Sequence, residues 1–208
     1  MQGGFNNISL HKKLKRQLIN QFMEKMLLIL SGPSGSGKTV ISERITAQED
    51  LKVKKVVTCT TRAARPEEVD GVHYNFWRQD RFAKAVQAGE MFEHAQVYGN
   101  HYGSRKADTV ELDNGYFPLF VVDVKGALTL QEKQFPYTSI FLRAPLNELE
   151  YRLYKRETDS PEVIMRRLAA AREEMNLASR FSHDIVNPDG QLEQTVQRVR
   201  DIILKATT

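Results

Sequence analysis

A run of small residues that ends in a lysine and a threonine has the composition and spacing of a phosphate-binding loop. It spans residues 32–39, with a glycine, four further residues and then glycine-lysine-threonine, and it directly follows the apolar residues 27–30. In such a loop the backbone N–H groups point at the β-phosphate of a nucleotide, and the positive end of the next helix adds to the attraction. The run therefore predicts a binding site for a nucleoside triphosphate.

Two side chains at the end of this loop have the chemistry to act on phosphates. Lys38 would reach the β- and γ-phosphates, and Thr39 would offer its hydroxyl to Mg²⁺. The alternative is a chance turn, but the apolar stretch before the loop and the helical pattern after it favour a true loop. We assign nucleotide binding to the whole run: Gly32, Pro33, Ser34, Gly35, Ser36, Gly37, Lys38 and Thr39.

A single acidic residue, Asp123, follows another apolar stretch at residues 117–122. Nucleotides bind at the carboxyl edge of the sheet in open α/β folds, which is where such a residue would lie. Asp123 is therefore predicted to organise a substrate or a metal ion. The alternative is that its carboxylate only caps the next helix.

Short apolar runs alternate with helical patterns from residue 26 onward, which is typical of a parallel sheet covered by helices. The predicted strands cover residues 27–30, 53–58, 117–122, 139–142 and 184–186. The predicted helices cover residues 38–47, 126–133, 146–155, 161–177 and 191–205. Between residues 60 and 104 the pattern changes to alternating segments, at 73–76 and 91–97, around a short helix at 80–87. The predicted fold is a three-layer α/β fold with an inserted β-rich lobe.

A chain of 208 residues is long enough for one main domain and too short for two large ones. We divide it into an N-terminal extension, residues 1–25, and one domain, residues 26–208. Within the domain we assign the core to residues 26–59 and 105–208, the inserted lobe to 60–104 and a helical lid to about 150–172.

The composition excludes a disordered chain and a membrane protein. The 41% hydrophobic and 27% charged residues are ordinary for a globular protein, and every apolar stretch is far shorter than the roughly 20 residues that span a bilayer. The single cysteine, Cys59, rules out an internal disulfide and is interpreted as a small strand residue. We therefore expect a cytoplasmic protein with no membrane partner.

The extension accounts for the whole net charge of +4, because it contains five basic residues and one acidic residue. The rest of the chain has no net charge. A neutral domain does not favour a nucleic-acid partner. The extension also carries Ile8, Leu14, Leu18 and Phe22 at near-helical spacing, which predicts a short amphipathic helix. A frayed arm, or residues added by an upstream start codon, are the alternatives.

Four further motifs follow the loop along the chain. They are Thr-Thr-Arg-Ala-Ala-Arg-Pro at 60–66, Gly-x-x-Tyr-Asn-Phe at 71–76, Phe-Glu-x-Ala-Gln at 92–96 and Gly-Asn-x-Tyr-Gly-Ser at 99–104. From about residue 27 to the end, the chain resembles the guanylate kinase family of P-loop nucleoside monophosphate kinases. The resemblance implies transfer of a phosphoryl group from ATP to GMP, and also to dGMP, with Mg²⁺ as cofactor.

The resemblance also implies which residues bind GMP. Arg62 and Arg65 would hold its phosphate, because a guanidinium fork matches phosphate oxygens. Glu93 would read the base, because guanine presents two N–H donors side by side and adenine does not. On residue type alone, the arginines could form a solvated turn and Glu93 could be a surface residue. The implied GMP-binding set is Thr58, Arg62, Arg65, Tyr74, Glu93, Tyr102, Ser104 and Asp123.

For catalysis, the resemblance implies that Lys38 and three lid arginines, Arg152, Arg156 and Arg167, neutralise charge on the moving phosphoryl group. Asn187 would contact the adenine of ATP. From the residues alone, an Arg/Glu-rich solvated helix and a turn at Asn187 are the alternatives.

The chain departs from the family pattern at two places. The family commonly has an acid-x-acid pair where this chain has Val121 and Asp123. Many relatives flank the second lid arginine with glycines, whereas Lys155 and Glu157 flank Arg156 here. The first departure places more weight on Asp123. The second predicts either a stiffer hinge or an extension of the preceding helix.

Two other functions are compatible with a chain of this kind. One is a guanylate-kinase-like interaction module that binds phosphopeptides with its inserted lobe, and the complete loop with Lys38 and Thr39 argues against it. The other is a kinase of a different small phosphorylated acceptor, against which Glu93 with Tyr74 and Tyr102 argues. The sequence leaves open whether the protein is a monomer or a homo-oligomer.

Overall fold

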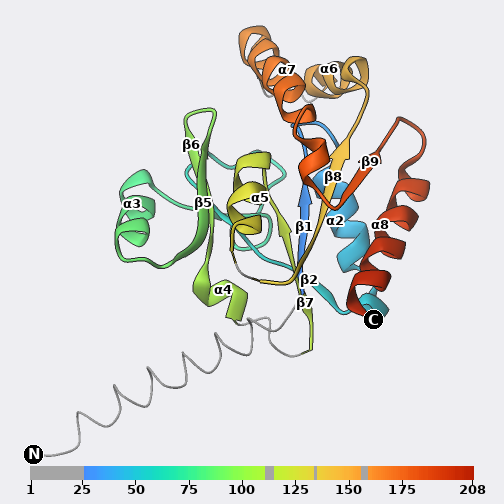
Figure 1. Ribbon diagram of the computed structural model, residues 1–208. Helices are drawn as coiled ribbons and strands as arrows, with labels where there is room; N and C mark the ends of the chain where they lie inside the picture. The colour runs from blue at the N-terminus through green and yellow to red at the C-terminus, as the bar shows by residue number, and fades with distance from the viewer. Residues whose placement is uncertain (1–25, 111–114, 134, 156–158) are drawn as a thin grey trace, which may run out of the picture.

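The computed structural model describes residues 26–110, 115–133, 135–155 and 159–208 (Figure 1). The amphipathic helix predicted in the extension and the lid residue Arg156 both lie outside the described residues.

A five-stranded parallel sheet forms the centre of the molecule. Its order is β2-β7-β1-β8-β9. The strands are β1 (Leu27–Ser31), β2 (Val53–Lys55), β7 (Phe117–Val121), β8 (Tyr137–Arg143) and β9 (His183–Val186). Because the strand order reverses at β1, its carboxyl end is a topological switch point, where open α/β folds bind ligands.

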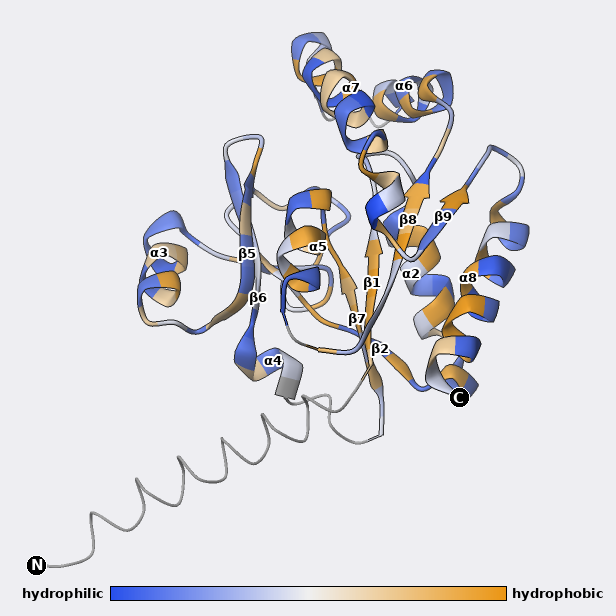
Figure 2. Cartoon of the chain, viewed as in Figure 1, coloured by the Kyte–Doolittle hydropathy of each residue, from blue (hydrophilic) through white to orange (hydrophobic). Residues whose placement is uncertain are grey.

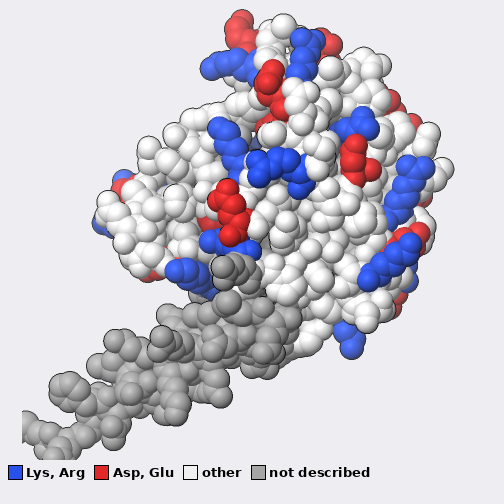
Figure 3. Space-filling view, viewed as in Figure 1, with Lys and Arg blue, Asp and Glu red and all other residues white. Residues whose placement is uncertain are grey.

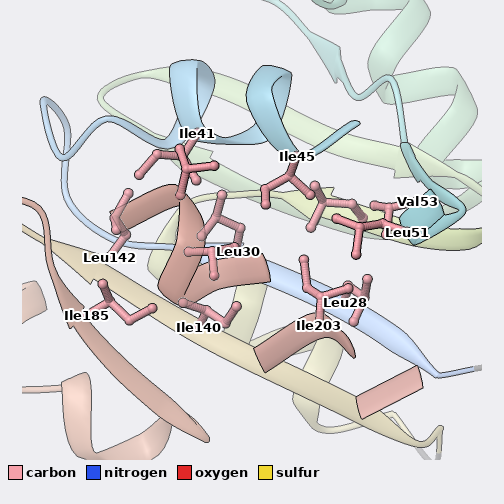
Figure 4. Packing of buried hydrophobic residues seen from close by; sticks show 13 residues of the cluster. Leu28, Leu30, Ile41, Ile45, Leu51, Val53, Ile140, Leu142, Ile185 and Ile203 are labelled. Atoms are coloured by element: carbon pink, nitrogen blue, oxygen red, sulfur yellow. The ribbon is translucent and has the colours of Figure 1, made fainter. Parts of the chain in front are cut away.

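Helices cover both faces of this sheet, which confirms the predicted three-layer α/β fold. On one face α2 (Lys38–Thr46) and α8 (Leu192–Thr207) pack over Leu28 and Leu30 of β1 (Figure 4). On the other face α5 (Val124–Gln131) packs over Leu27 and Ile29. Successive residues of a strand point to opposite faces, so a strand buried on both sides must be apolar throughout. Figure 2 shows the central strands β1 and β7 as largely apolar.

A second sheet of four strands lies beside α5 (Figure 1). Its order is β4-β3-β6-β5, and α3 (Gln79–Gln87) packs against it through a small core of Trp77, Phe82 and Met91. The strands are β3 (Cys59–Thr60), β4 (Asn75–Phe76), β5 (Met91–Val97) and β6 (Asn100–Arg105). The short helix α4 (Lys106–Val110), which the sequence pattern does not predict, follows β6 and packs against β5 and β6.

The predicted strand at residues 53–58 is wrong in its length, because the ladder of β2 ends at Lys55. The backbone N–H of Val56 still donates to the carbonyl of Leu119 in the central sheet, at 2.9 Å, whereas the carbonyl of Thr58 accepts from Asn75 of the second sheet, at 2.9 Å. The chain therefore changes sheets within these residues.

A helical pair stands above the carboxyl end of the central sheet (Figure 1). It consists of α6 (Leu146–Lys155) and α7 (Pro161–Met175), which bury a separate cluster that includes Leu149, Leu153 and Leu168. The 3₁₀ turns η1 (Glu49–Leu51) and η2 (Ala178–Arg180) complete the described elements. Within the described ranges, no helix combines the length and the apolar character needed to cross a membrane.

Candidate active site

One cleft collects residues from the phosphate-binding loop, the second sheet and the helical pair. On the face shown in Figure 3, basic and acidic side chains gather between the second sheet on the left and the helical pair at the top. The lining residues are Gly32, Ser34, Gly35, Gly37, Lys38, Thr39, Thr58, Arg62, Arg65, Tyr74, Glu93, Val97, Tyr98, Tyr102, Gly103, Val121, Val122, Asp123, Arg167 and Glu174. Most of the predicted site residues are therefore brought together.

The loop needs glycine at two positions for steric reasons. Gly32 has a φ of 141°, and a Cβ atom there would lie 1.9 Å from the carbonyl oxygen of Leu142 in β8. Gly37 has a φ of 100°, and its Cβ would lie 2.5 Å from Nδ2 of Asn187. Left-handed backbone is costly for other residues, so these contacts fix both the residue type and the path of the loop.

Lys38 begins α2 and lies over the loop that precedes it. Its Nζ donates to the carbonyl oxygens of Gly32, at 2.6 Å, and of Pro33, at 2.9 Å. The next residue, Thr39, lies in the same wall of the cleft. The loop thus presents one ammonium group and one hydroxyl beside the helix N-terminus, which suits a polyphosphate.

Two predicted site residues, Asn187 and Arg152, bind the loop from outside the cleft. Asn187 is buried, and its Nδ2 donates to the carbonyl of Ser36 at 2.9 Å. Arg152 donates to the carbonyl of Gly35 at 3.2 Å and to Asp189 Oδ1 at 2.6 Å. Neither belongs to the described lining of the cleft. In this arrangement both side chains bind backbone carbonyls of the loop and so support its shape, and their predicted contacts with ATP stay predictions.

Arg167 on α7 is the lid arginine that lines the cleft within the described part of the chain. Its Nη1 lies 3.4 Å from Ser34 Oγ of the loop and forms an ion pair with Asp159 Oδ2 at 3.1 Å. The guanidinium carbon also lies 5.6 Å from the centre of the Tyr98 ring, in the turn between β5 and β6. Arg167 thus contacts both walls of the cleft.

Arg62 and Arg65 face the cleft from the segment after β3, together with two tyrosines. The Arg62 guanidinium carbon lies 5.5 Å from the ring centre of Tyr74, and the rings of Tyr74 and Tyr102 meet edge to face at 6.2 Å. A fifth residue, Glu68, binds Arg62 through both carboxylate oxygens, at 2.7 and 2.9 Å. Sequence reasoning missed Glu68, and its only signal was an acid placed three and six residues after the two arginines.

Glu93 lines the cleft and is buried, with 4% of its surface exposed. Oγ of Ser104 donates to its Oε1 at 2.8 Å, and a Cβ at Gly126 would lie 3.2 Å from its Oε2. The pairing of β5 with β6 shifts register between Met91 and Glu93. Such a bulge re-aims side chains. In a regular strand Met91 and Glu93 would point to the same face, whereas here Met91 packs with Trp77 and Phe82 and Glu93 lines the cleft.

Burial raises the pKa of Glu93 to about 7, with a further contribution from the nearby Asp123 and an opposing one from the Ser104 hydroxyl. Burial also raises the pKa of Glu174, which Lys38 opposes. Both carboxyl groups line the cleft. Raised acid pKa values within one cleft are typical of functional sites.

Asp123 has two roles in the structure. Its Oδ1 accepts the backbone N–H of Gly126 at 3.0 Å, so it caps α5 as the structural alternative proposed. Asp123 nevertheless lines the cleft, as does Val121 two residues before it. Thr58 is buried and also lines the cleft, whereas the Ser104 hydroxyl is bound to Glu93.

The donors in the cleft fit a metal ion that is held largely by phosphates and water. Among the described residues there is no cluster of three or more His, Cys, Asp or Glu side chains that could hold a metal alone. Thr39, Asp123 and Glu174 do face the same space. Mg²⁺ usually keeps several waters and binds one or two carboxylates together with substrate phosphates, so this oxygen set suits it.

Comparison with known proteins supports a single family. A family model described as guanylate kinase matches residues 24–206. A guanylate kinase of Streptococcus thermophilus (strain CNRZ 1066) is 42% identical over 180 residues, which are 86% of this chain and 85% of that protein. A guanylate kinase of Cereibacter sphaeroides is 43% identical over 173 residues, 81% of this chain and 82% of that protein. The crystal structure of guanylate kinase from Anaplasma phagocytophilum has a TM-score of 0.72 and 28% identity, and covers 89% of this chain and 88% of that one.

The buried carboxyl group of Glu93 predicts a pH-dependent stability. Its pKa rises from an ordinary 4.5 to about 7 on folding, so the folded state loses stability as the pH rises between these values. Glu93→Gln removes this titration, and the variant should gain up to about 3 kcal/mol relative to the wild type between pH 4.5 and pH 8. Urea unfolding at several pH values measures the difference. Glu90→Gln, at an exposed position nearby, is the matched control, and equal pH dependence in all three proteins would contradict the prediction.

Proposed function

Because the chain belongs to the guanylate kinase family, we infer that it transfers the γ-phosphoryl group of ATP to GMP, forming ADP and GDP. The observation that carries this inference is the shared cleft. A phosphate-binding loop from the central sheet and a buried carboxylate from the second sheet face the same space. One wall suits a triphosphate, and the other suits a guanine base with an adjacent phosphate.

We propose that residues 32–39 hold the triphosphate of ATP. The backbone N–H groups and Lys38 would bind the β- and γ-phosphates, while Arg167 would reach the moving phosphoryl group from the lid. Asn187 and Arg152 would act indirectly on ATP. They bind the carbonyls of Ser36 and Gly35 and so support the shape of the loop.

GMP is proposed to lie along the second sheet. Arg62, Arg65 and the hydroxyls of Tyr74 and Tyr102 would bind its phosphate. Glu93, oriented by Ser104, would accept the N1–H and N2–H of guanine, while adenine presents a lone pair at N1 and leaves the carboxylate unpaired. Thr58 would add a hydroxyl at the base.

Catalysis in this arrangement rests on position and charge. Phosphoryl transfer needs little covalent chemistry from the protein, so holding donor and acceptor in line and neutralising the equatorial oxygens lower the barrier. We propose Mg²⁺ as the cofactor, held by Thr39 with help from Asp123. It would screen the charge of the β- and γ-phosphates. Lys38 and Arg167 supply the fixed positive charges around the same phosphates.

We further propose that two parts of the chain close over the substrates: the lobe at residues 60–104 and the lid at about 150–172. The contact of Arg167 with both Ser34 and Tyr98 supports this proposal, because these residues belong to opposite walls. Closure would exclude water and so prevent hydrolysis of ATP.

A cytosolic setting is proposed on the chemistry of Cys59. The thiol is buried, and burial raises its pKa to about 12, so it stays protonated and unreactive at neutral pH. A lone buried thiol suits a reducing compartment.

The acceptor specificity is tested by ADP release from the purified protein with ATP and Mg²⁺. We expect rapid ADP release with GMP, release also with dGMP, and at least about tenfold slower release with AMP, UMP and CMP, because Glu93 lacks paired donors in those bases. The protein without any acceptor is the control for hydrolysis. ADP release that does not depend on GMP would refute the proposed function.

The base-reading role of Glu93 is tested by Glu93→Gln. The variant should raise the KM for GMP by about tenfold or more and leave the KM for ATP within about twofold, because only the guanine contacts lose a charged acceptor. In the wild type, the KM for GMP should rise as the pH falls below about 7, where Glu93 takes up a proton, and the variant should lack this rise. Steady-state kinetics with Glu90→Gln as control measure both effects. An unchanged KM for GMP in Glu93→Gln would remove the base-reading role.

A further inference from the structure

Glu68 places a negative charge inside the site that is proposed to bind a phosphate. Its side chain is nine-tenths buried, with 9% of its surface exposed, beside Arg62 at 15% and Arg65 at 25%. A carboxylate repels a phosphate, so its presence beside the two arginines needs an explanation. The inference below rests on the proposed binding of GMP by these arginines.

The carboxylate is held by its own turn. Residues 65–68 form a turn in which the N–H of Glu68 donates to the carbonyl of Arg65 at 3.0 Å, and Pro66 sets the backbone for it. The backbone N–H of Arg65 donates in return to Glu68 Oε2 at 2.8 Å. The carboxylate therefore has a backbone contact within its own turn, in addition to its bonds with arginine side chains.

Arg62 binds the carboxylate of Glu68 through both of its terminal guanidinium nitrogens. Nη1 donates to Oε2 at 2.9 Å and Nη2 to Oε1 at 2.7 Å, while Nη1 of Arg65 lies 3.8 Å from Oε1. Two-point pairing fixes the plane of a guanidinium as well as its position. The carboxylate of Glu68 thus orients the guanidinium of Arg62 and forms a second, longer ion pair with Arg65.

The charges favour the same interpretation. Two guanidinium groups repel each other, and the single carboxylate offsets this repulsion while leaving the trio of Arg62, Arg65 and Glu68 with a net positive charge. Burial alone would raise the pKa of Glu68, but the bonds from Arg62 and from the Arg65 N–H hold it below its ordinary value. Glu68 therefore stays ionised at neutral pH.

We propose that Glu68 is a positioning residue for the acceptor phosphate: it holds Arg62 and Arg65 in place before GMP arrives. Without it, each arginine would have to lose its side-chain freedom when the phosphate binds. Both arginines line the cleft together with Tyr74 and Tyr102. A carboxylate that merely occupied the place of the phosphate would compete with GMP, and its removal would have the opposite effect.

Steady-state kinetics of Glu68→Gln test the proposal, with Glu67→Gln, one residue earlier and exposed, as the matched control. We expect the KM for GMP to rise about tenfold or more in Glu68→Gln, with kcat and the KM for ATP within about twofold of the wild type. Glu68→Asp keeps the charge and should recover part of the loss, and it provides a second variant if Glu68→Gln unfolds. A lower or unchanged KM for GMP in both variants would overturn the proposal.

Calorimetric binding of GMP and of guanosine separates positioning from general damage. Guanosine has no phosphate, so Glu68→Gln should weaken GMP about tenfold and leave guanosine unchanged. Equal weakening of both ligands would show a merely structural role and overturn the proposal. The wild-type protein distinguishes the two levels of inference: if it fails to phosphorylate GMP the proposed function is wrong, whereas normal wild-type turnover with an unaffected variant rejects only the role of Glu68.

Discussion

The shape of the phosphate-binding loop is the constraint on which the rest of the site depends. Its backbone must leave β1 and turn back without a side chain at Gly32, because the carbonyl of Leu142 in the next strand occupies that space. Asn187 then holds the carbonyl of Ser36, and Arg152 holds the carbonyl of Gly35. The path of the loop backbone therefore follows from the packing of β1 against β8 and from two side chains late in the chain.

The acceptor side is built on a different principle, in which buried charges are oriented by fixed partners. Burial destabilises the charged form of Glu93 and so raises its pKa. The hydroxyl of Ser104 donates to one of its carboxylate oxygens and orients it. Glu68 is fixed by its own turn and in turn orients Arg62. A site with its charges already in place loses less entropy on binding and discriminates more sharply between ligands.

The sequence was sufficient for the features that depend on local pattern. The loop, the parallel sheet and the helices on both faces follow from glycine spacing, apolar runs and helical periodicity, and the structure confirms them. Features set by distant contacts could not be predicted: the chain changes sheets after Lys55, and β5 is bulged before Glu93. The loop-binding role of Asn187 and the pairing of Glu68 with Arg62 likewise depend on side-chain geometry that spacing does not encode.

In the proposed function, one cleft binds a triphosphate and a guanine nucleotide side by side. A compound in which adenosine and guanosine are joined through five phosphates would fill both halves at once, and its binding can be measured by titration calorimetry. One molecule should bind per chain, at least about a hundredfold more tightly than ATP or GMP alone, because the second half binds at high effective concentration. Binding no tighter than that of ATP alone would contradict a shared cleft.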